Sequence, residues 1–363
     1  MNERPGIVLP RAEAPARVSE SWFGALLRGL IGVLLCLTPV TAVLVLGWLM
    51  RLMAREGAIS LLRQDGKVAR ADVLAGLLAS QQFKSLARPP GWFRLAEGSL
   101  IRRSLGGLWL NLILGLKALI ATAACVLPFG LLWLLGWWAG WDNSFNKGYE
   151  QAWVGPTVGF SGVAIALFTL SYLPIGLAHM ALEGRTAAFF EIRRVLSLIA
   201  CAGWRMWLLA LATALAALPL FAYRGMPVFM EGIYPEMAQL EPDALKEFAG
   251  RYRLLGALWM FAALAWLRKR SARIYAFASR RALAGDPVLM AGSQAREVLR
   301  AAGALPEPSK KPKRRGPLRA LVWMVAMAPL WFGLVAQIFV GQFLNHTWAL
   351  WLSHPFYALP WLP

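Results

Sequence analysis

Six apolar stretches that contain no Asp, Glu, Lys or Arg alternate with basic segments along the chain. They cover residues 29–50, 118–141, 151–182, 206–223, 254–267 and 320–363. A helix needs about 20 apolar residues to cross the hydrocarbon of a bilayer, and most of these stretches are long enough. The pattern predicts an all-α fold, a polytopic helical membrane protein with about six transmembrane helices.

Two of the six stretches leave a second interpretation open. The first carries Pro39 near its middle, so a re-entrant hairpin is the alternative to one full crossing. The fifth has only 14 charge-free residues. A crossing there requires Arg251, Arg253 and Arg268 to carry their charges to the headgroups. A helix lying in the membrane interface is the alternative for that stretch.

The positive charge of the chain is concentrated in three segments between the apolar stretches. The chain has 38 Lys and Arg against 19 Asp and Glu, for a formal net charge of +19. Residues 51–103, 183–205 and 268–319 contain 28 of those 38 basic residues. Because basic loops stay on the cytoplasmic side, these loops are predicted to be cytoplasmic, in the inner (cytoplasmic) membrane of a bacterium. If the first stretch crosses fully, both termini lie outside.

The loops and stretches divide the chain into three parts. Residues 1–28 form a polar N-terminal tail, residues 29–351 a helical membrane domain, and residues 352–363 a short C-terminal tail. Hydrophobic residues make up 58% of the chain and charged residues 16%, a composition with too few charges to cover a soluble domain of this length.

The first basic loop contains a pattern typical of an amphipathic helix. Val73, Leu74 and Leu77 fall at helical spacing behind Asp72, a residue type that caps helices. The Pro-Pro-Gly sequence at residues 89–91 then breaks the pattern. We therefore expect a short cytoplasmic helix before the second apolar stretch.

A faint internal repeat follows three of the stretches. Residues 53–57 (MAREG) are similar to residues 180–184 (MALEG), and residues 282–285 (ALAG) are a weaker third copy. Three repeated helical hairpins are one explanation, because membrane folds often arise by repetition. Glycine C-caps at unrelated helix ends are the other.

Two blocks resemble a known family. They are Pro39 with residues 47–51 (GWLMR), and residues 183–196 (EGRTAAFFEIRRVL). Together they resemble an uncharacterised prokaryotic family of polytopic membrane proteins, a domain of unknown function, over residues 29–218. The chain departs from that family in its longer first loop and in Trp48, where tyrosine is more typical. The resemblance implies an integral-membrane fold and no activity.

Catalytic and metal-binding patterns are scarce. The three His residues are His179, His346 and His354, and no Cys/His or Glu/His pair has metal-ligand spacing. The three Cys residues lie singly in or beside apolar stretches and read as packing residues. No glycine-rich phosphate loop is present. The sequence therefore predicts no cofactor and no metal, and favours a protein that is not an enzyme.

Few polar residues in the apolar regions suit a transporter. A coupled transporter usually needs an ionisable group inside the membrane, and the charge-free stretches contain no Asp or Glu. Lys117 and His179 are the candidate intramembrane polar residues. Proline kinks in five stretches would also suit a transporter, although proline is frequent in membrane helices generally. These prolines are Pro39, Pro128, Pro174, Pro219 and Pro329.

Two basic clusters are the candidate contacts for lipid or a partner protein. Arg185, Arg193 and Arg194 lie beside Phe189 and Phe190 and form one such surface. The other is a basic linker of Lys310, Lys311, Lys313, Arg314 and Arg315. Basic residues next to a membrane attract anionic lipids and fix topology. Nucleic acid is disfavoured, because the linker lacks interleaved aromatic residues and belongs to no recognisable binding module.

Tryptophans gather around the end of the second stretch and the start of the third. They are Trp133, Trp137, Trp138, Trp141 and Trp153. An aromatic belt at the headgroup level is the favoured interpretation, because indole is apolar with one polar N–H. A ligand platform is the alternative.

These observations favour a non-enzymatic structural, assembly or accessory component of the inner membrane. Its expected partners are membrane lipids, above all anionic ones, and a protein of a membrane complex. The alternative is a small-molecule or lipid transporter with proline-kinked helices. An enzyme comes third.

Overall fold

The computed structural model describes residues 22–63, 68–80, 82–93, 100–139, 153–233, 241–308, 316–345, 354 and 356–361. Within these residues the chain consists of helices and has no strand, so the predicted all-α fold is confirmed. The helices are α1 (Trp22–Leu35), α2 (Pro39–Leu62), α3 (Arg70–Ala79), α4 (Lys84–Ala87), α5 (Leu100–Trp137), α7 (Val154–Glu183), α8 (Thr186–Phe189), α9 (Ile192–Ala202), α10 (Trp204–Ile233), α11 (Pro242–Gly285), α12 (Gln294–Ala301) and α13 (Pro317–Asn345).

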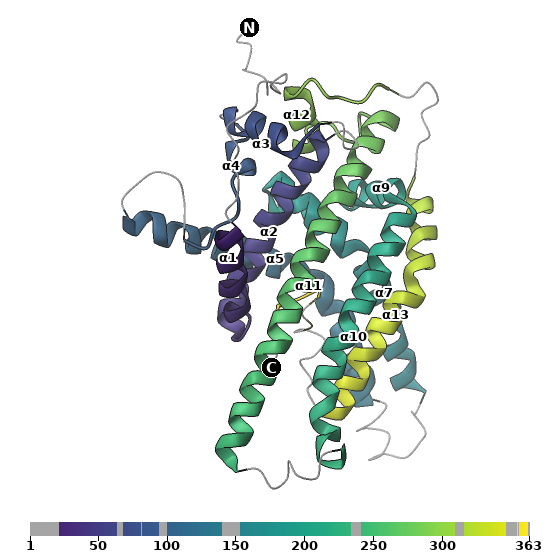
Figure 1. Cartoon of the computed structure of the whole chain (residues 1–363). Coiled ribbons are helices and arrows are strands. Elements are labelled where there is room, and N and C mark those ends of the chain that lie inside the picture. The colour runs from purple at the N-terminus through teal and green to yellow at the C-terminus, as the bar shows by residue number, and fades with distance from the viewer. Residues whose placement is uncertain are drawn as a thin grey trace.

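Four helices in the described part of the chain are long and apolar enough to cross a membrane. Their apolar segments are Leu105–Trp137 in α5, Val154–Glu183 in α7, Trp204–Tyr223 in α10 and Pro317–Val340 in α13. α7 packs against α5 and α13, and α13 packs against α10, so the four belong to one bundle (Figure 1). They correspond to the second, third, fourth and sixth apolar stretches. The arrangement fits a helical membrane protein.

The first apolar stretch does not form a single helix. α1 ends at Leu35, and α2 begins at Pro39 after a short turn. Thr38 caps α2, because its hydroxyl oxygen accepts a hydrogen bond from the N–H of Thr41, and proline fits the first helical turn. α1 has 14 residues and is about 21 Å long, too short to cross alone. The stretch is therefore divided between two helices, and α1 and α2 form a helical hairpin (Figure 1).

The fifth apolar stretch lies in the middle of α11. This helix has 44 residues, about 66 Å, and runs beside α10 along the bundle (Figure 1). It packs against α2, α7, α9 and α10, so the stretch is not an isolated surface helix. Arg268 does not reach outward as expected: the residue is 7% exposed, and its Nη2 donates to the carbonyl of Phe356 at 3.4 Å. Residues 356–358, expected in a C-terminal tail, are buried as well.

Glycines allow the long helices to touch backbone to backbone. A Cβ atom at Gly47 in α2 would lie 1.8 Å from the carbonyl oxygen of Asn111 in α5. A Cβ atom at Gly115 in α5 would lie 1.9 Å from the carbonyl oxygen of Val43 in α2. At Gly136, a Cβ atom would meet the backbone of α7 at 2.6 to 2.8 Å. Small residues therefore bring the helices into close contact there.

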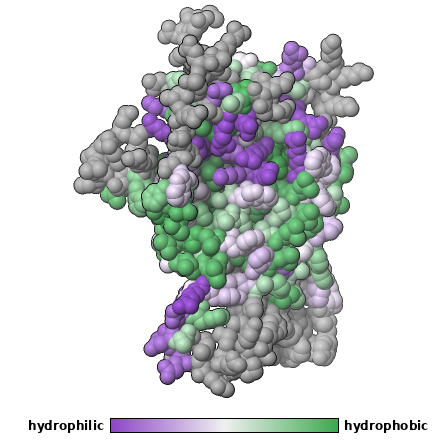
Figure 2. All heavy atoms as spheres, in the orientation of Figure 1, coloured by the Kyte–Doolittle hydropathy of each residue, from purple (hydrophilic) through white to green (hydrophobic). Residues whose placement is uncertain are grey.

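The short helices α3, α4, α9 and α12 lie toward one end of the bundle, called here the polar end (Figure 1). Figure 2 shows hydrophilic side chains concentrated at this end and a hydrophobic band below it. α3 is the amphipathic helix predicted in the first loop, with Val73, Leu74 and Leu77 buried against the bundle. Its N-cap is Ala69, and Asp72 stands in the first turn instead of at the cap.

The glycines of the sequence repeat have different roles. Gly184 takes a left-handed conformation with φ of 69° and caps α7, and its N–H bonds the carbonyl of Met180. Gly57 lies inside α2, and Gly285 is the last residue of α11. Helix capping therefore explains Gly184 and does not explain Gly57.

Candidate functional site

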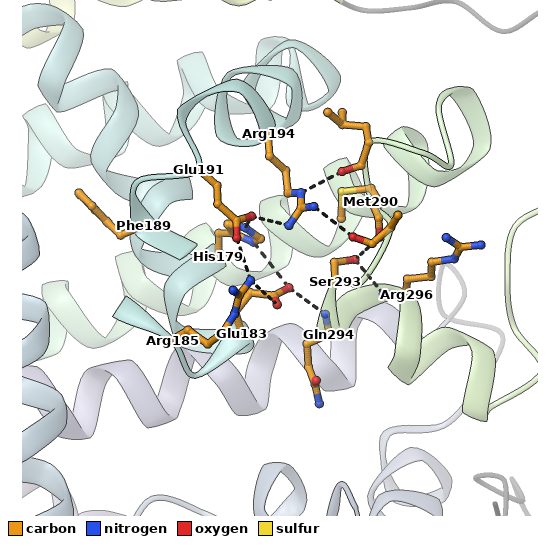
Figure 3. A network of polar contacts seen from close by, with 12 residues as sticks. His179, Glu183, Arg185, Phe189, Glu191, Arg194, Met290, Ser293, Gln294 and Arg296 are labelled. Carbon is orange, nitrogen blue, oxygen red and sulfur yellow. Dashed lines mark hydrogen bonds and ion pairs between the residues drawn. The ribbon is translucent and has the colours of Figure 1, made fainter. Parts of the chain in front are cut away.

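A network of charged side chains at the polar end joins the end of α7 to the segments that follow α7 and α11 (Figure 3). His179 and Glu183 are four residues apart near the end of α7 and share one face. Because Gly184 ends the helix, the chain turns, and Glu191 at the start of α9 comes back over His179. Arg194 in the first turn of α9 completes the network.

Both carboxylates of the network have basic partners. Oε2 of Glu191 lies 3.0 Å from Nε2 of His179, and Oε1 accepts from Nη2 of Arg185 at 2.7 Å. Arg194 also donates to Glu191. Glu183 lies 3.6 Å from Nη2 of Arg185, and its side chain is 3% exposed. The side chain of Glu191 is 26% exposed, so the network meets solvent there.

The charges around Glu191 fix the protonation of its neighbours. Partial burial alone would raise the pKa of Glu191, but the hydrogen bond with His179 and the charges of Arg194 and Arg185 hold that pKa below its usual range. An ionised carboxylate only accepts hydrogen bonds, so His179 donates from Nε2. Its Nδ1 then accepts a hydrogen bond from the hydroxyl of Tyr275 at 3.0 Å. One neutral tautomer of His179, with its proton on Nε2, makes both hydrogen bonds.

The same network attaches the connection between α11 and α12. Oε1 of Glu183 accepts the backbone N–H of Gln294, the first residue of α12, at 2.8 Å. Nε of Arg194 donates to the carbonyl of Leu289 at 2.9 Å, and its Nη2 donates to that of Ala291 at 3.1 Å. Segments about 100 residues apart in sequence are thereby held together.

A second cluster on α2 has a similar form. The side chain of Glu56 is 4% exposed and binds Nη2 of Arg70 in α3 at 3.0 Å and Nε of Arg273 in α11 at 2.7 Å. The neighbouring Arg55 donates from Nε to the carbonyl of Ala87 in α4 at 3.1 Å. This cluster fastens the first basic loop to α2 and α11.

The chemistry of both clusters suits the positioning of chain segments. His179 and Tyr275 are 0% exposed, so neither can meet a substrate without movement of the helices. Among the residues that the structure describes, no three His, Cys, Asp or Glu side chains are placed to hold a metal ion. The hydrogen bonds of the two clusters join loops to helix ends.

The structure separates the residues predicted from the sequence as contacts. Arg185 and Arg194 belong to the α7 network, whereas Arg193 is exposed on α9. His179 is buried in that network, and Lys117 is exposed on α5. The basic linker residues Lys310, Lys311, Lys313, Arg314 and Arg315 lie outside the described residues.

A groove that the sequence analysis missed lies between α10 and α11, at the level where the apolar segments of both helices begin or end. It has a volume of about 560 Å³. Arg205, Arg270 and Arg273 lie along it together with Trp204 and Trp266. The other lining residues are Leu208, Leu209, Ala212 and Ile274. We call this the arginine groove.

The arginine groove is basic and carries no acidic lining residue. The guanidinium of Arg205 stacks 3.3 Å from the ring centroid of Phe277, and that of Arg270 lies 5.2 Å from Trp266. Neither has an acidic partner within the described ranges, whereas Arg273 binds Glu56. The spacing of residues 266, 270 and 273 on one helix face was the signal in the sequence.

The predicted aromatic belt is divided. Trp133 and Trp137 line an apolar pocket of about 430 Å³ with phenylalanines of α7 and α13. Trp138 and Trp153 are exposed to the surroundings of the bundle, and Trp141 lies outside the described residues. Exposed indoles beside an apolar pocket suit contact with lipid chains and headgroups.

Comparison of the chain with known protein families, with characterised proteins and with solved structures finds no match.

Proposed function

We propose that this chain is a multi-pass protein of a bacterial inner membrane and acts as a non-enzymatic structural, assembly or accessory component. Its polar end faces the cytoplasm in this proposal and holds anionic lipid, with a partner protein as the other possible occupant. The observation that carries the proposal is the arginine groove, where three arginines meet apolar walls and no acidic lining residue.

The groove has the features that an anionic phospholipid requires. Basic residues near a membrane surface attract anionic headgroups by about 1 kcal/mol each. Trp204 and Trp266 suit the headgroup level, and Leu208 and Ala212 offer an apolar wall to an acyl chain. Arg205 and Arg270 are oriented by stacking on aromatic rings, so less side-chain freedom is lost when a phosphate binds.

We further propose that α5, α7, α10, α11 and α13 cross the membrane and that the α1–α2 hairpin re-enters from the cytoplasmic side. Five crossings and a re-entrant hairpin then replace the six crossings predicted from the sequence, and the N-terminus lies in the cytoplasm. In this topology the basic segments after α2, α7 and α11 share one side, as the positive-inside rule requires.

A repeat of helical hairpins is part of the same proposal. Glu56 in α2 and Glu183 in α7 occupy matching places in the repeated sequence. Each is nearly buried and lies close to arginine, Glu56 to Arg70 of α3 and Glu183 to Arg185 two residues along the chain. The proposed membership in an uncharacterised family of membrane proteins agrees with this architecture and supplies no activity.

A transporter is the second candidate, and one observation favours it. Arg268 is a buried cation inside the bundle, and such residues often mark a substrate or ion path. Lys117 and His179 are weaker candidates, because the first is exposed and the second is bound within the α7 network. In the transporter, replacement of Arg268 would change uptake without changing assembly.

Extraction into native-lipid nanodiscs, followed by mass spectrometry of the proteins and lipids retained, tests the proposal. Enriched anionic phospholipid, or a partner protein at fixed stoichiometry, would support it. A chain that carries neither would contradict it. Movement of that lipid across reconstituted vesicles would favour the transporter over the accessory component.

A further inference from the structure

We propose that a small cavity around Arg268 binds one monovalent anion of halide size. The cavity lies between α7, α10, α11 and α13 and is bordered by the C-terminal segment through Phe356 and Tyr357. Its volume is about 30 Å³. A cavity needs about 10–15 Å³ of such space to hold one water molecule. This cavity therefore has room for a chloride ion and excludes larger metabolites.

The first argument is the charge of Arg268, which has no acidic partner among the residues that the structure describes. The residue is 7% exposed, and its one hydrogen bond within the described residues runs from Nη2 to the carbonyl of Phe356 at 3.4 Å. None of the described residues that line the cavity is acidic. Buried charges in proteins are paired or coordinate an ion, because isolating one from water is costly. A water molecule could accept a hydrogen bond here but would leave the positive charge unbalanced.

The second argument is the buried indole N–H of Trp331, a residue that lines the same cavity. Trp331 is 2% exposed, and its Nε1–H has no hydrogen-bond partner in the described part of the chain. An indole nitrogen can only donate, so this group requires an acceptor. A buried donor without a partner calls for an ion or a water that completes the site.

The remaining polar residues of the cavity supply no negative charge to balance Arg268. The hydroxyl of Thr213 donates to the carbonyl of Leu209, and that of Ser271 donates to the carbonyl of Leu267. Each hydroxyl proton is therefore held by its own helix. Tyr357 adds a neutral hydroxyl, and the other described side chains of the wall are apolar, so the cavity combines a cation and an N–H donor in surroundings that strengthen their attraction for an anion.

The test is thermal unfolding of the purified full-length protein in sodium chloride and in sodium gluconate of equal ionic strength, because gluconate is too large for the cavity. The proposal expects a saturable rise of the melting temperature with chloride. Arg268→Met should abolish that rise. Lys269→Met, which removes a charge one residue away and outside the cavity, should retain it. Equal melting temperatures in the two salts, or a chloride response that survives in Arg268→Met, would overturn the proposal.

A second variant covers the case in which Arg268→Met does not fold. Trp331→Phe keeps an aromatic ring and removes only the Nε1–H donor, so the chloride concentration at half-saturation should rise about tenfold. Equilibrium dialysis with radioactive chloride should find one ion per chain in the wild type. The proposal would be overturned if the chloride concentration at half-saturation were unchanged in Trp331→Phe, or if less than one chloride bound per chain at saturation.

Discussion

Nε2 of His179 lies 3.0 Å from Oε2 of Glu191, and this contact closes the turn between α7 and α9. Glu191→Ala would leave Arg185 and Arg194 without that carboxylate and His179 without its acceptor. We expect the variant to lose about 1–3 kcal/mol of stability, because the buried His179 would be left without its acceptor. Thermal unfolding in detergent measures this. Wild-type stability in Glu191→Ala would contradict the role of the network.

The contribution of Glu191 should depend on pH. Its pKa is held below the usual value of 4.5, although burial acts in the opposite direction, because His179, Arg194 and Arg185 favour the charged form. A carboxylate with a lowered folded-state pKa stabilises the fold above its unfolded pKa and loses that effect as the pH falls through the folded pKa. Wild-type stability should therefore decline below about pH 4.5, more steeply than that of Glu191→Gln. Parallel pH profiles for the two proteins would refute this.

The cluster on α2 should hold the first basic loop in place. In Glu56→Ala, Arg70 and Arg273 lose a carboxylate that is 4% exposed, and we expect a loss of about 1–3 kcal/mol. Hydrogen exchange in residues 68–80 should accelerate. The control is Glu297→Ala, which breaks a solvent-exposed pair with Arg300 and should cost less than about 1 kcal/mol. Equal losses of stability in the two variants would contradict the role of Glu56 in holding the first basic loop.

The close contact of α2 and α5 should depend on two glycines. Gly47→Ala and Gly115→Ala each place a Cβ atom less than 2 Å from a backbone carbonyl oxygen of the partner helix. Backbone has to move, so each substitution should cost at least about 1–3 kcal/mol. Gly333→Ala on α13 meets nothing within 4 Å and should be neutral or slightly stabilising. Thermal unfolding of the three variants compares them, and the same melting temperature in all would disprove the contact.

The sequence predicted the long helices well where charge was absent. The stretches that became α5, α7, α10 and α13 have strong hydropathy signals. The charged flanks were a poorer guide to the helix ends, since α5 begins at Leu100, before Lys117, and α10 continues past Arg224 to Ile233. The break between α1 and α2 was present as a Thr–Pro pair at residues 38 and 39, a common start of a helix. The length of the first apolar stretch favoured a single crossing, so the prediction gave this break too little weight.

Contacts over long sequence separations could not be predicted. Arg194 binds carbonyls of residues 289 and 291, which no local pattern indicates. The same arginine was read as a surface contact, because basic residues beside phenylalanines suggest a membrane face. The burial of Arg268 was also missed, since it depends on the return of the C-terminal segment to the bundle.

The most direct test of the proposed function measures how much anionic lipid the arginine groove retains. The full-length protein is extracted into native-lipid nanodiscs, and the bound phospholipids are quantified by mass spectrometry. We predict enrichment of anionic phospholipid over the bulk membrane in the wild type and a loss of at least half of that enrichment in Arg205→Gln/Arg270→Gln. The control Lys269→Gln/Arg319→Gln removes two charges outside the groove and should keep the enrichment. If the enrichment is unchanged in Arg205→Gln/Arg270→Gln, the lipid binds elsewhere on the protein. The proposed function itself would be contradicted if wild-type nanodiscs had the lipid composition of the bulk membrane and contained no partner protein.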